Sequence, residues 1–265
     1  MKNSTQWQWT AAPELMPAAF ASLDKVFALR GEVITRDRLS ELLKVTIADE
    51  TFYLKRYSQA AKGLRRYFGK PRIQREWENL LWFAKKGIPT AEVVACGMET
   101  KLGLFQRGAM ITREIPDAMD LATLARTMDP RLQDRAWVAQ ISAQAAQMLW
   151  QMHRHGFIHN DYKWRNLLVD SSNKLYIIDS PMGCYWPHPL FRYRMIKEIA
   201  MLDRVAKYRL RATQRLNFFL IYRGHQRLEA DDKKILRQLL GRKERRPSSF
   251  AILAAYFLLI QAYDG

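Results

Sequence analysis

Hydrophobic residues near the start of the chain fall into short runs that predict strands. Residues 43–47 and 51–57 are rich in β-branched and aromatic side chains, and residues 48–50 separate them. This pattern is typical of a β-hairpin. Further short apolar runs at residues 93–94 and 110–112 predict additional strands. The first part of the chain is therefore expected to contain a β-sheet.

Apolar residues recur at helical spacing in two longer stretches. In residues 72–86 they return every three or four positions, and Gly87 follows at the expected end of the helix. In the second stretch the spacing is four, four, three and four, which builds one continuous face, and Gly156 ends the pattern. The members of this second face are Trp137, Ile141, Ala145, Met148 and Met152. Both stretches are predicted to be helices.

The second half of the chain has a mostly helical pattern. Residues 175–178 form one short apolar strand that ends in Asp179, and residues 191–265 predict several basic helices. With 265 residues the chain is long enough for one large domain or two small ones. We expect an α+β fold of two lobes, with a small strand-rich lobe at residues 1–115 and a larger helical lobe at residues 116–265.

Residues of the kind used in phosphoryl transfer cluster in the helical lobe. Residues 159–166, HNDYKWRN, place an asparagine five positions after an aspartate, and Asp179 follows thirteen residues later. Phosphoryl transfer needs a carboxylate near the acceptor hydroxyl, oxygen ligands for magnesium, and a cation beside the transferred group. The spacing resembles the catalytic loop H-x-D-x-K-x-x-N and the metal-binding aspartate of the protein-kinase-like fold.

A lysine and a glutamate earlier in the chain form a second candidate group. Lys55 lies in the strand-like segment FYLK, and Glu76 lies on the predicted helix about twenty residues later. In kinases such a pair holds the α- and β-phosphates of the nucleotide. Glu78 is two residues further on, about 200° around the helix, so only one of the two glutamates can face Lys55. We prefer Glu76, which stands in Arg-Glu-Trp as in similar small kinases, and Glu78 is the alternative.

Other motifs in the chain have simpler explanations. His153, His155 and His159 lead into the catalytic loop as in kinases, so a structural role is expected for them in place of a metal cluster. The run at residues 63–71 looks like a P-loop, but it has one residue too many and a proline where serine or threonine must bind metal. No G-x-G-x-x-G motif precedes the strand lysine. An atypical phosphate-covering loop around residues 36–40 is expected, with its residues left open.

Four segments resemble one branch of this fold. They are FYLKRY at residues 52–57, REWENL at 75–80, GIPT at 87–90 and DYKWRNLL at 161–168. They resemble the bacterial lipopolysaccharide core kinases, the Kdo and heptose kinase family, and the resemblance covers roughly residues 30–210. It implies transfer of the γ-phosphate of ATP to a Kdo or heptose hydroxyl of the inner core, on the cytoplasmic side before export. Which sugar and which hydroxyl are modified stays open.

The resemblance implies a role for each matching residue of the catalytic loop. Asp161 would be the base or the carboxylate that orients the hydroxyl, and Lys163 would contact the γ-phosphate. Asn166 and Asp179 would hold magnesium, and His159 would brace the loop.

The nucleotide-binding residues implied by the resemblance lie earlier in the chain. Lys55 and Glu76 would fix the α- and β-phosphates of ATP. Residues 110–115 would form the hinge that faces adenine, with backbone groups offered by Glu114 or its neighbours. ATP and Mg²⁺ are therefore the expected ligands.

Departures from the protein-kinase pattern argue against a protein as the phosphate acceptor. Asp179 is followed by Ser180-Pro181 in place of Phe-Gly, and no A-P-E sequence follows. The short, proline-containing stretch at residues 182–189 argues against a phosphorylated activation loop and a protein substrate cleft. Similar kinases often have an aspartate that braces the catalytic loop, and residues 197–199, Lys-Glu-Ile, stand at that place in this chain. The sequence therefore leaves open which residue braces the loop.

The chain carries an unusual excess of positive charge. It has 43 Lys and Arg against 26 Asp and Glu, a formal net charge of +17 and an isoelectric point near 10. Basic runs lie at residues 55–75, 192–215 and 233–246. We expect an acceptor that is already phosphorylated and anchored in an anionic membrane. The expected partners are the lipopolysaccharide core or its lipid-anchored precursor and the anionic inner-membrane surface.

The cysteine content and the apolar runs indicate the cellular compartment in which the protein is expected. Two cysteines, Cys96 and Cys184, favour a reduced compartment, and the N-terminus lacks the apolar core of a signal peptide. Residues 250–263 are too few to cross a bilayer and predict a buried helix. We expect a cytoplasmic protein, peripheral on the inner membrane. The alternatives are an atypical protein kinase, a small-molecule kinase, or a silent scaffold or nucleic-acid binder, although no nucleic-acid motif is recognisable.

Overall fold

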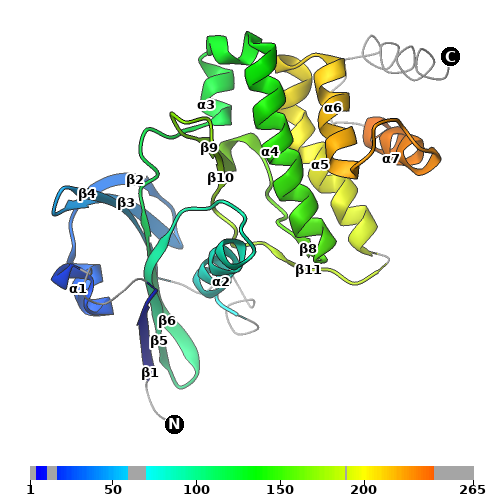
Figure 1. Cartoon of the computed structure of the whole chain (residues 1–265). Coiled ribbons are helices and arrows are strands. Elements are labelled where there is room, and N and C mark those ends of the chain that lie inside the picture. Colours follow the sequence, from blue (N-terminus) through cyan, green and yellow to red (C-terminus); the bar gives the residue numbers. More distant parts are fainter. Residues whose placement is uncertain (1–3, 11–16, 59–69, 189, 242–265) are drawn as a thin grey trace. The chain divides into compact units, whose positions relative to one another are not determined.

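The structure is a computed structural model that describes residues 4–10, 17–58, 70–188 and 190–241 (Figure 1). The chain divides into two compact units. Unit 1 contains Met1–Ala118 and Tyr176–Gly183, and unit 2 contains Met119–Leu175 and Cys184–Gly265. The apolar run at residues 250–263, predicted to be a buried helix, lies outside the described residues.

The described strands of unit 1 include a six-stranded antiparallel sheet in the order β1-β5-β6-β4-β3-β2 (Figure 1). These strands are β1 (Ser4–Trp9), β2 (Glu32–Arg36), β3 (Ser40–Ile47), β4 (Glu50–Tyr57), β5 (Val93–Lys101) and β6 (Leu104–Arg113). The predicted hairpin is confirmed as β3 and β4. Ala48 and Asp49 join them with φ angles of 52° and 63°, the positive values that a two-residue hairpin turn requires. The strands predicted at 93–94 and 110–112 are confirmed within the longer β5 and β6.

In the described part of unit 1, two α-helices accompany the sheet, α1 (Leu23–Ala28) and α2 (Arg72–Lys85). The helix predicted from apolar spacing is confirmed as α2, and it ends before Gly87, which has a φ of 69°. The buried face of α2 consists of Ile73, Glu76, Trp77, Leu80 and Phe83. The helix therefore carries one carboxylate into an otherwise apolar face.

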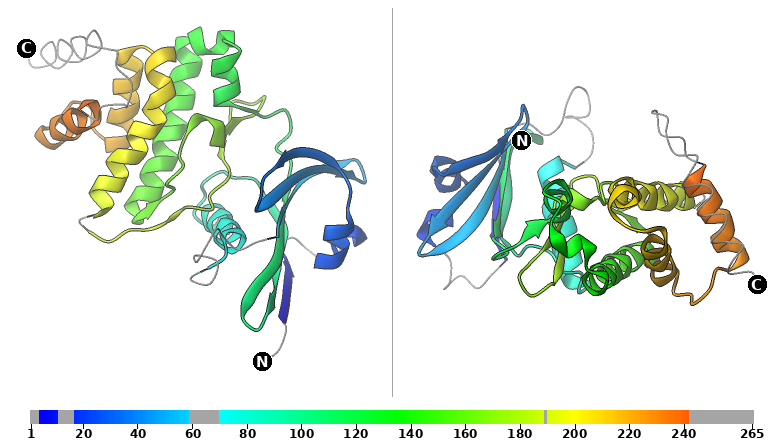
Figure 2. Two further views of the ribbon diagram at one scale, coloured as in Figure 1. Left: turned by 180° about the vertical axis from the view of Figure 1, so that it is seen from behind. Right: turned by 90° about the horizontal axis from the view of Figure 1, so that it is seen from above.

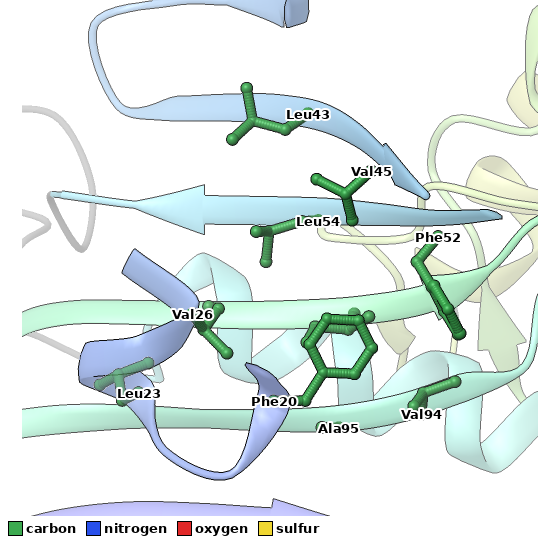
Figure 3. Close-up of a cluster of buried hydrophobic side chains, with 11 residues drawn as sticks. Phe20, Leu23, Val26, Leu43, Val45, Phe52, Leu54, Val94 and Ala95 are labelled. Carbon is green, nitrogen blue, oxygen red and sulfur yellow. The ribbon is translucent and has the colours of Figure 1, made fainter. Parts of the chain in front are cut away.

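Side chains from α1 and from the short 3₁₀ turn before it, Ala18–Phe20, pack against the central strands (Figure 3). The buried cluster consists of Phe20, Leu23, Val26, Leu43, Val45, Phe52, Leu54, Val94, Ala95, Ala109 and Ile111. Phe20 and Phe52 meet edge to face, with ring centroids 5.0 Å apart. Because β4 carries both Phe52 and Lys55, this cluster fixes the strand that presents the candidate lysine.

A segment from late in the chain completes unit 1. Strand β10 (Leu175–Ile177) begins in unit 2 and ends in unit 1. The Ile177 N–H donates to the Pro89 carbonyl at 2.9 Å, and the Ile177 carbonyl accepts from the Thr90 hydroxyl at 2.6 Å. These bonds explain why residues 176–183 group with unit 1, although the sequence analysis assigned them to the helical lobe.

Unit 2 is mostly helical. Its described helices are α3 (Leu121–Arg126), α4 (Arg135–Arg154), α5 (Leu190–Arg209), α6 (Ala212–Arg223) and α7 (Ala230–Leu240). Short antiparallel pairs join β7 (Met119–Asp120) to β9 (Leu167–Val169), and β8 (Phe157–Ile158) to β11 (Cys184–Tyr185). Helix α4 packs against α6, and α5 lies beside α6 and α7 (Figure 2). In the described ranges, no helix is long and apolar enough to cross a membrane.

Helix α4 leads through β8 into the loop that holds Asp161. Asp134 begins the helix by accepting hydrogen bonds from the backbone N–H groups of Ala136 at 2.8 Å and Trp137 at 3.3 Å. The predicted apolar face is confirmed, because its five members are all buried. Gly156, with a φ of 73°, lets the chain leave the helix and enter β8.

Replacing Phe52 with alanine is expected to lower the free energy of unfolding by about 3 to 5 kcal/mol, because it removes a fully buried ring and leaves a cavity beside Phe20. Val33→Ala, at an exposed position of β2, is the control and is expected to change this free energy by less than about 0.5 kcal/mol. Urea denaturation followed by circular dichroism measures both. Equal effects of the two substitutions would contradict this account of the core.

Candidate active site

The ammonium group of Lys55 lies between two carboxylates in unit 1. Lys55 is on β4, Glu76 is on α2, and Asp179 follows β10. The Lys55 Nζ atom is 2.6 Å from Glu76 Oε1 and 2.8 Å from Asp179 Oδ1. The side chains of Lys55 and Glu76 are 19% and 2% exposed, so this ion pair is largely removed from water. A strand, a helix and a late loop thus contribute to one charged cluster.

Neighbouring side chains decide which glutamate pairs with Lys55. The Tyr57 hydroxyl donates to Glu76 Oε2 at 3.1 Å, and Lys55 Nζ lies 5.8 Å from the centre of the Tyr57 ring. Glu78 instead pairs with Lys70, at 2.7 Å. Of the two glutamates left open by the sequence, Glu76 is therefore the partner of Lys55.

The carboxylates of this cluster hold Lys55 in its charged form. Burial by itself lowers the pKa of a lysine, but the negative charges of Glu76 and Asp179 outweigh burial and raise the pKa of Lys55 well above its ordinary value. Burial also raises the pKa of the Tyr57 hydroxyl, which stays neutral and donates to Glu76. Lys55 is therefore a cation throughout the physiological pH range.

The segment that carries Asp179 is held by α2. The side-chain amide of Asn79 donates to the carbonyl oxygens of Ser180 at 2.7 Å and Gly183 at 3.1 Å. Asp179 has a φ of 59°, a conformation that is uncommon for residues other than glycine and that needs such support. Sequence reasoning missed Asn79, because its partners are backbone groups 101 and 104 residues further along the chain.

The loop after β8 gathers the candidate residues of unit 2. Lys163 Nζ is 2.5 Å from Asp161 Oδ1. The Asn166 side-chain amide donates to the Asp161 carbonyl oxygen at 2.9 Å and to Asp161 Oδ2 at 3.1 Å. A 3₁₀ turn, Trp164–Asn166, brings the asparagine back to the aspartate. Asn166 is buried, whereas the Asp161 side chain is 23% exposed, so the aspartate is oriented and still accessible.

Glu198 of α5 anchors the backbone just before Asp161. Its carboxylate accepts hydrogen bonds from the backbone N–H groups of Asn160 at 2.6 Å and His159 at 3.3 Å. Asn160 has a φ of 63°, which asparagine tolerates better than most residues. Glu198 is 1% exposed, so little water competes for these N–H groups. The bracing position that the sequence left open is thus filled by a glutamate.

Two further buried side chains support Glu198. His153 Nε2 is 2.8 Å from Glu198 Oε2, and His153 Nδ1 is 2.7 Å from the Tyr222 hydroxyl. His153, Glu198 and Tyr222 come from α4, α5 and α6. Burial raises the pKa of Tyr222, which keeps its hydroxyl protonated. The structural role predicted for His153 is confirmed. Sequence reasoning missed this chain of bonds, because the partners of His153 lie 45 and 69 residues away.

Glu114, in the segment expected to face adenine, bonds within unit 1 through its backbone N–H and its carboxylate. Its backbone N–H donates to the Thr51 carbonyl at 2.9 Å and is therefore engaged near the start of β4. Its carboxylate pairs with Lys44 at 2.8 Å and accepts from the Tyr53 hydroxyl at 3.2 Å. The hydrogen bond from Lys44 lowers the pKa of Glu114 below its ordinary value. The Glu114 N–H is thus already bonded, and the expected role of Glu114 or its neighbours at the hinge stays a prediction.

The turn expected to cover the phosphates lies between β2 and β3. Asp37 Oδ1 accepts hydrogen bonds from the backbone N–H groups of Leu39 at 2.6 Å and Ser40 at 2.7 Å, and the first of these contributes most to the lowered pKa of Asp37. The turn is compact although residues 36–40 contain no glycine. Residues 63–69, most of the rejected P-loop-like run, lie outside the described residues.

The predicted site residues form two groups, each within one unit. Unit 1 holds Lys55, Glu76 and Asp179, and unit 2 holds Asp161, Lys163 and Asn166. Glu114, in unit 1, belongs to neither group. The first group combines a buried cation with two carboxylates, and the second combines an accessible carboxylate with an amide and a second cation. This is the set of residue types that phosphoryl transfer requires.

Comparison with known proteins adds independent information. A sequence profile described as the lipopolysaccharide kinase (Kdo/WaaP) family matches residues 29–180. The 3-deoxy-D-manno-octulosonic acid kinase of Vibrio parahaemolyticus serotype O3:K6 (strain RIMD 2210633) is 27% identical over 108 residues. This match covers 41% of the present chain and 42% of the relative, so the chain spans less than half the length of the curated relative that it matches.

A solved structure described as "WaaP in complex with acyl carrier protein" is similar in fold. Its TM-score is 0.64 at 21% sequence identity, and the match covers 82% of the present chain and 88% of that chain. At this identity the likeness shows a shared fold. The kinase-like α+β fold expected from the sequence is confirmed by this match and by the observed elements.

Replacing Glu76 with glutamine is expected to lower the pKa of Lys55, because the substitution removes a negative charge that counteracts burial. Glu78→Gln, two positions along the same helix, is the matched control and is expected to leave Lys55 unchanged, since Glu78 pairs with Lys70. A pH titration of ¹³C-lysine-labelled protein by NMR measures the shift. The assignment of Glu76 would be wrong if the Lys55 resonance titrated identically in both variants.

Proposed function

The chain belongs to the lipopolysaccharide kinase (Kdo/WaaP) family, and we propose that it transfers the γ-phosphate of ATP to a Kdo or heptose hydroxyl of the lipopolysaccharide inner core. The observation that carries this proposal is the pair of charged groups, one in each unit. The first offers a buried lysine held between carboxylates, and the second offers an aspartate held by a lysine and an asparagine. These are the parts that phosphoryl transfer uses.

Lys55 binds the α- and β-phosphates of ATP. A lysine ammonium group has three N–H donors, and Glu76 and Asp179 orient it from two sides. The raised pKa of Lys55 preserves the positive charge that the phosphates require. Glu76 positions the lysine from α2. Backbone groups of Glu114 or its neighbours face adenine.

Asp161 orients the acceptor hydroxyl and accepts its proton. The acceptor oxygen forms a bond to the γ-phosphorus while the bond from that phosphorus to the β–γ bridging oxygen breaks, so ADP and the sugar phosphate are the products. Lys163 offsets negative charge on the γ-phosphoryl group as it moves. Asn166 and the backbone bonds to Glu198 hold Asp161 in place for this step.

Asn166 and Asp179 have the ligand chemistry that Mg²⁺ requires. Mg²⁺ takes oxygen ligands and is commonly bound by one or two carboxylates together with substrate phosphates. Because Asn166 uses its side-chain N–H₂ group to donate to Asp161, its side-chain oxygen is the atom suited to a cation. A bound magnesium ion would supply positive charge to the phosphate oxygens. Both residues therefore fit the role of magnesium ligands.

The acceptor is anionic and anchored in a membrane. The formal net charge of +17 favours an acceptor that already carries phosphate, as well as the anionic inner-membrane surface. The name of the curated relative makes Kdo the first acceptor to test. We therefore propose a cytoplasmic protein that works at the inner membrane.

A sugar acceptor suits this site better than a protein acceptor. In protein kinases the phenylalanine after the metal-binding aspartate takes part in switching between active and inactive states. Here that position is Ser180, which is buried, and Asn79 holds its carbonyl oxygen. A fixed segment of this kind fits an enzyme that is not switched through an activation loop.

Asp161→Asn is expected to reduce phosphotransfer by about 10² to 10⁴-fold, because the substitution removes the proton acceptor. ATP affinity should change little, since the phosphate-binding lysine is untouched. Asp134→Asn is the control, because Asp134 only caps α4 and asparagine caps helices equally well. Transfer of ³²P from ATP to deacylated Kdo-containing inner core measures the rate. Near-normal transfer by the Asp161 variant would rule out the mechanism, and absence of transfer by the unaltered protein to any core acceptor would rule out the function.

Glu198→Ala is expected to lower kcat by about 10²-fold with little change in the KM for ATP, because a displaced Asp161 loses its alignment with the acceptor. Glu198→Asp keeps the carboxylate and should recover part of the lost rate. Thermal unfolding of both variants identifies any loss of folding. A purely structural role for Glu198 predicts instead that activity per folded molecule is unchanged.

A further inference from the structure

One side of α5 carries a mixture of cationic, aromatic and aliphatic side chains, most of them exposed. At about 100° per residue, seven positions fall on the same face of this helix. We call them the α5 stripe: Leu190, Tyr193, Arg194, Lys197, Met201, Arg204 and Tyr208. The opposite face is buried and consists of Met195, Ile196, Ile199, Leu202 and Ala206. The α5 stripe therefore lies on the side of the helix away from its buried face.

Three of the four apolar and aromatic members of the stripe are largely exposed, and Met201 is half-buried. Tyr208 is 65% exposed, Tyr193 is 55% exposed and Leu190 is 51% exposed. Single exposed apolar residues are common on protein surfaces, but these follow one line along a helix of 20 residues. Such a helix is about 30 Å long, so the stripe extends over a distance typical of a contact surface.

The structure separates the cations of the basic run at residues 192–215 into two kinds. Arg192 pairs with Asp231 at 2.7 Å, and Arg215 donates from Nε to Asp203 Oδ1 at 2.6 Å. These two charges are offset within unit 2. Among the cations of the α5 stripe, Lys197 and Arg204 are exposed. Arg194 is half-buried and stacks on the Trp186 ring, 4.0 Å from its centroid.

The acidic residues of α5 lie off the stripe. The helix contains two of them, Glu198 and Asp203. Glu198 is buried beneath the catalytic loop, and Asp203 pairs with Arg215. The α5 stripe thus combines three cations with two tyrosines, a leucine and a methionine, and it contains no acid.

This composition matches the chemistry of an anionic bilayer surface. Lys and Arg near such a surface are attracted by acidic headgroups, while Tyr, Leu and Met side chains enter the boundary between headgroups and acyl chains. Tyr is also enriched at membrane interfaces, because its ring is apolar and its hydroxyl reaches water. A nucleic acid would satisfy the cations but would leave the exposed Leu190 side chain in water.

We propose that the α5 stripe is the surface by which this protein docks on an anionic membrane. The helix lies along the membrane plane, with its cations at the headgroups and its tyrosines and aliphatic residues at the acyl boundary. The purpose of docking rests on the proposed function, because a lipid-anchored acceptor must be met at a membrane. The docking itself is testable without any acceptor.

Vesicle binding tests the surface directly. Vesicles of phosphatidylethanolamine with phosphatidylglycerol are compared with vesicles of phosphatidylcholine in co-sedimentation. The double variants Lys197→Glu/Arg204→Glu and Tyr193→Ser/Tyr208→Ser are each expected to bind anionic vesicles at least tenfold more weakly than the unaltered protein. The control is Trp150→Ser/Arg154→Glu on α4, which disrupts an exposed tryptophan with an arginine 4.7 Å from its ring centroid. This control should bind like the unaltered protein.

The outcomes separate the alternatives. Equal loss in the α4 control, or unchanged binding in the stripe variants, would overturn the docking surface. Loss of RNA binding in the stripe variants, without vesicle binding by the unaltered protein, would overturn it in favour of a nucleic-acid surface. Thermal unfolding shows whether the substituted surface residues leave the fold intact.

Kinase assays keep this inference distinct from the proposed function. The stripe variants should phosphorylate soluble deacylated core at the normal rate and lipid-anchored core in vesicles at least tenfold more slowly. Failure of the unaltered protein to phosphorylate either acceptor would reject the proposed function, while its vesicle binding would still decide the docking surface. Equal slowing on both acceptors would assign the stripe to the active site and reject the docking role.

Discussion

The ammonium group of Lys55, held between Glu76 and Asp179, is the interaction on which the candidate site of unit 1 depends. It joins a strand, a helix and a segment from late in the chain. Glu76 is almost wholly buried, and an unpaired carboxylate there would cost about 3 to 5 kcal/mol. The three elements are therefore held together by the same charges that keep Lys55 protonated.

Unit 2 uses a buried carboxylate for a different purpose. Glu198 binds the two backbone N–H groups that precede Asp161, and His153 and Tyr222 hold Glu198 in turn. Three helices thus fix a short loop that has little regular structure of its own. The side chain of Asp161 stays accessible because its support acts on the backbone and on the neighbouring Asn166.

The secondary-structure elements that depend on local sequence pattern were predictable from the sequence. The hairpin of β3 and β4, helix α2 and helix α4 follow from alternation and helical spacing, and the structure confirms them. The fold and the family were also predictable, because four motif segments occur in the expected order. Contacts between distant residues were not predictable: Asn79 binds backbone more than a hundred residues away, and Glu198 replaces the usual aspartate. The roles of the site residues in catalysis stay predictions.

The central claim is that the charged cluster of Lys55, Glu76 and Asp179 serves the phosphorylation of a lipopolysaccharide core sugar. The most direct test is mass spectrometry of the core oligosaccharide from a strain that lacks the gene for this chain. The account predicts that the core lacks one phosphate, that the unaltered gene restores it, and that a gene encoding Lys55→Met does not. A core of unchanged mass in the deletion strain, or full restoration by the Lys55→Met protein, would contradict it.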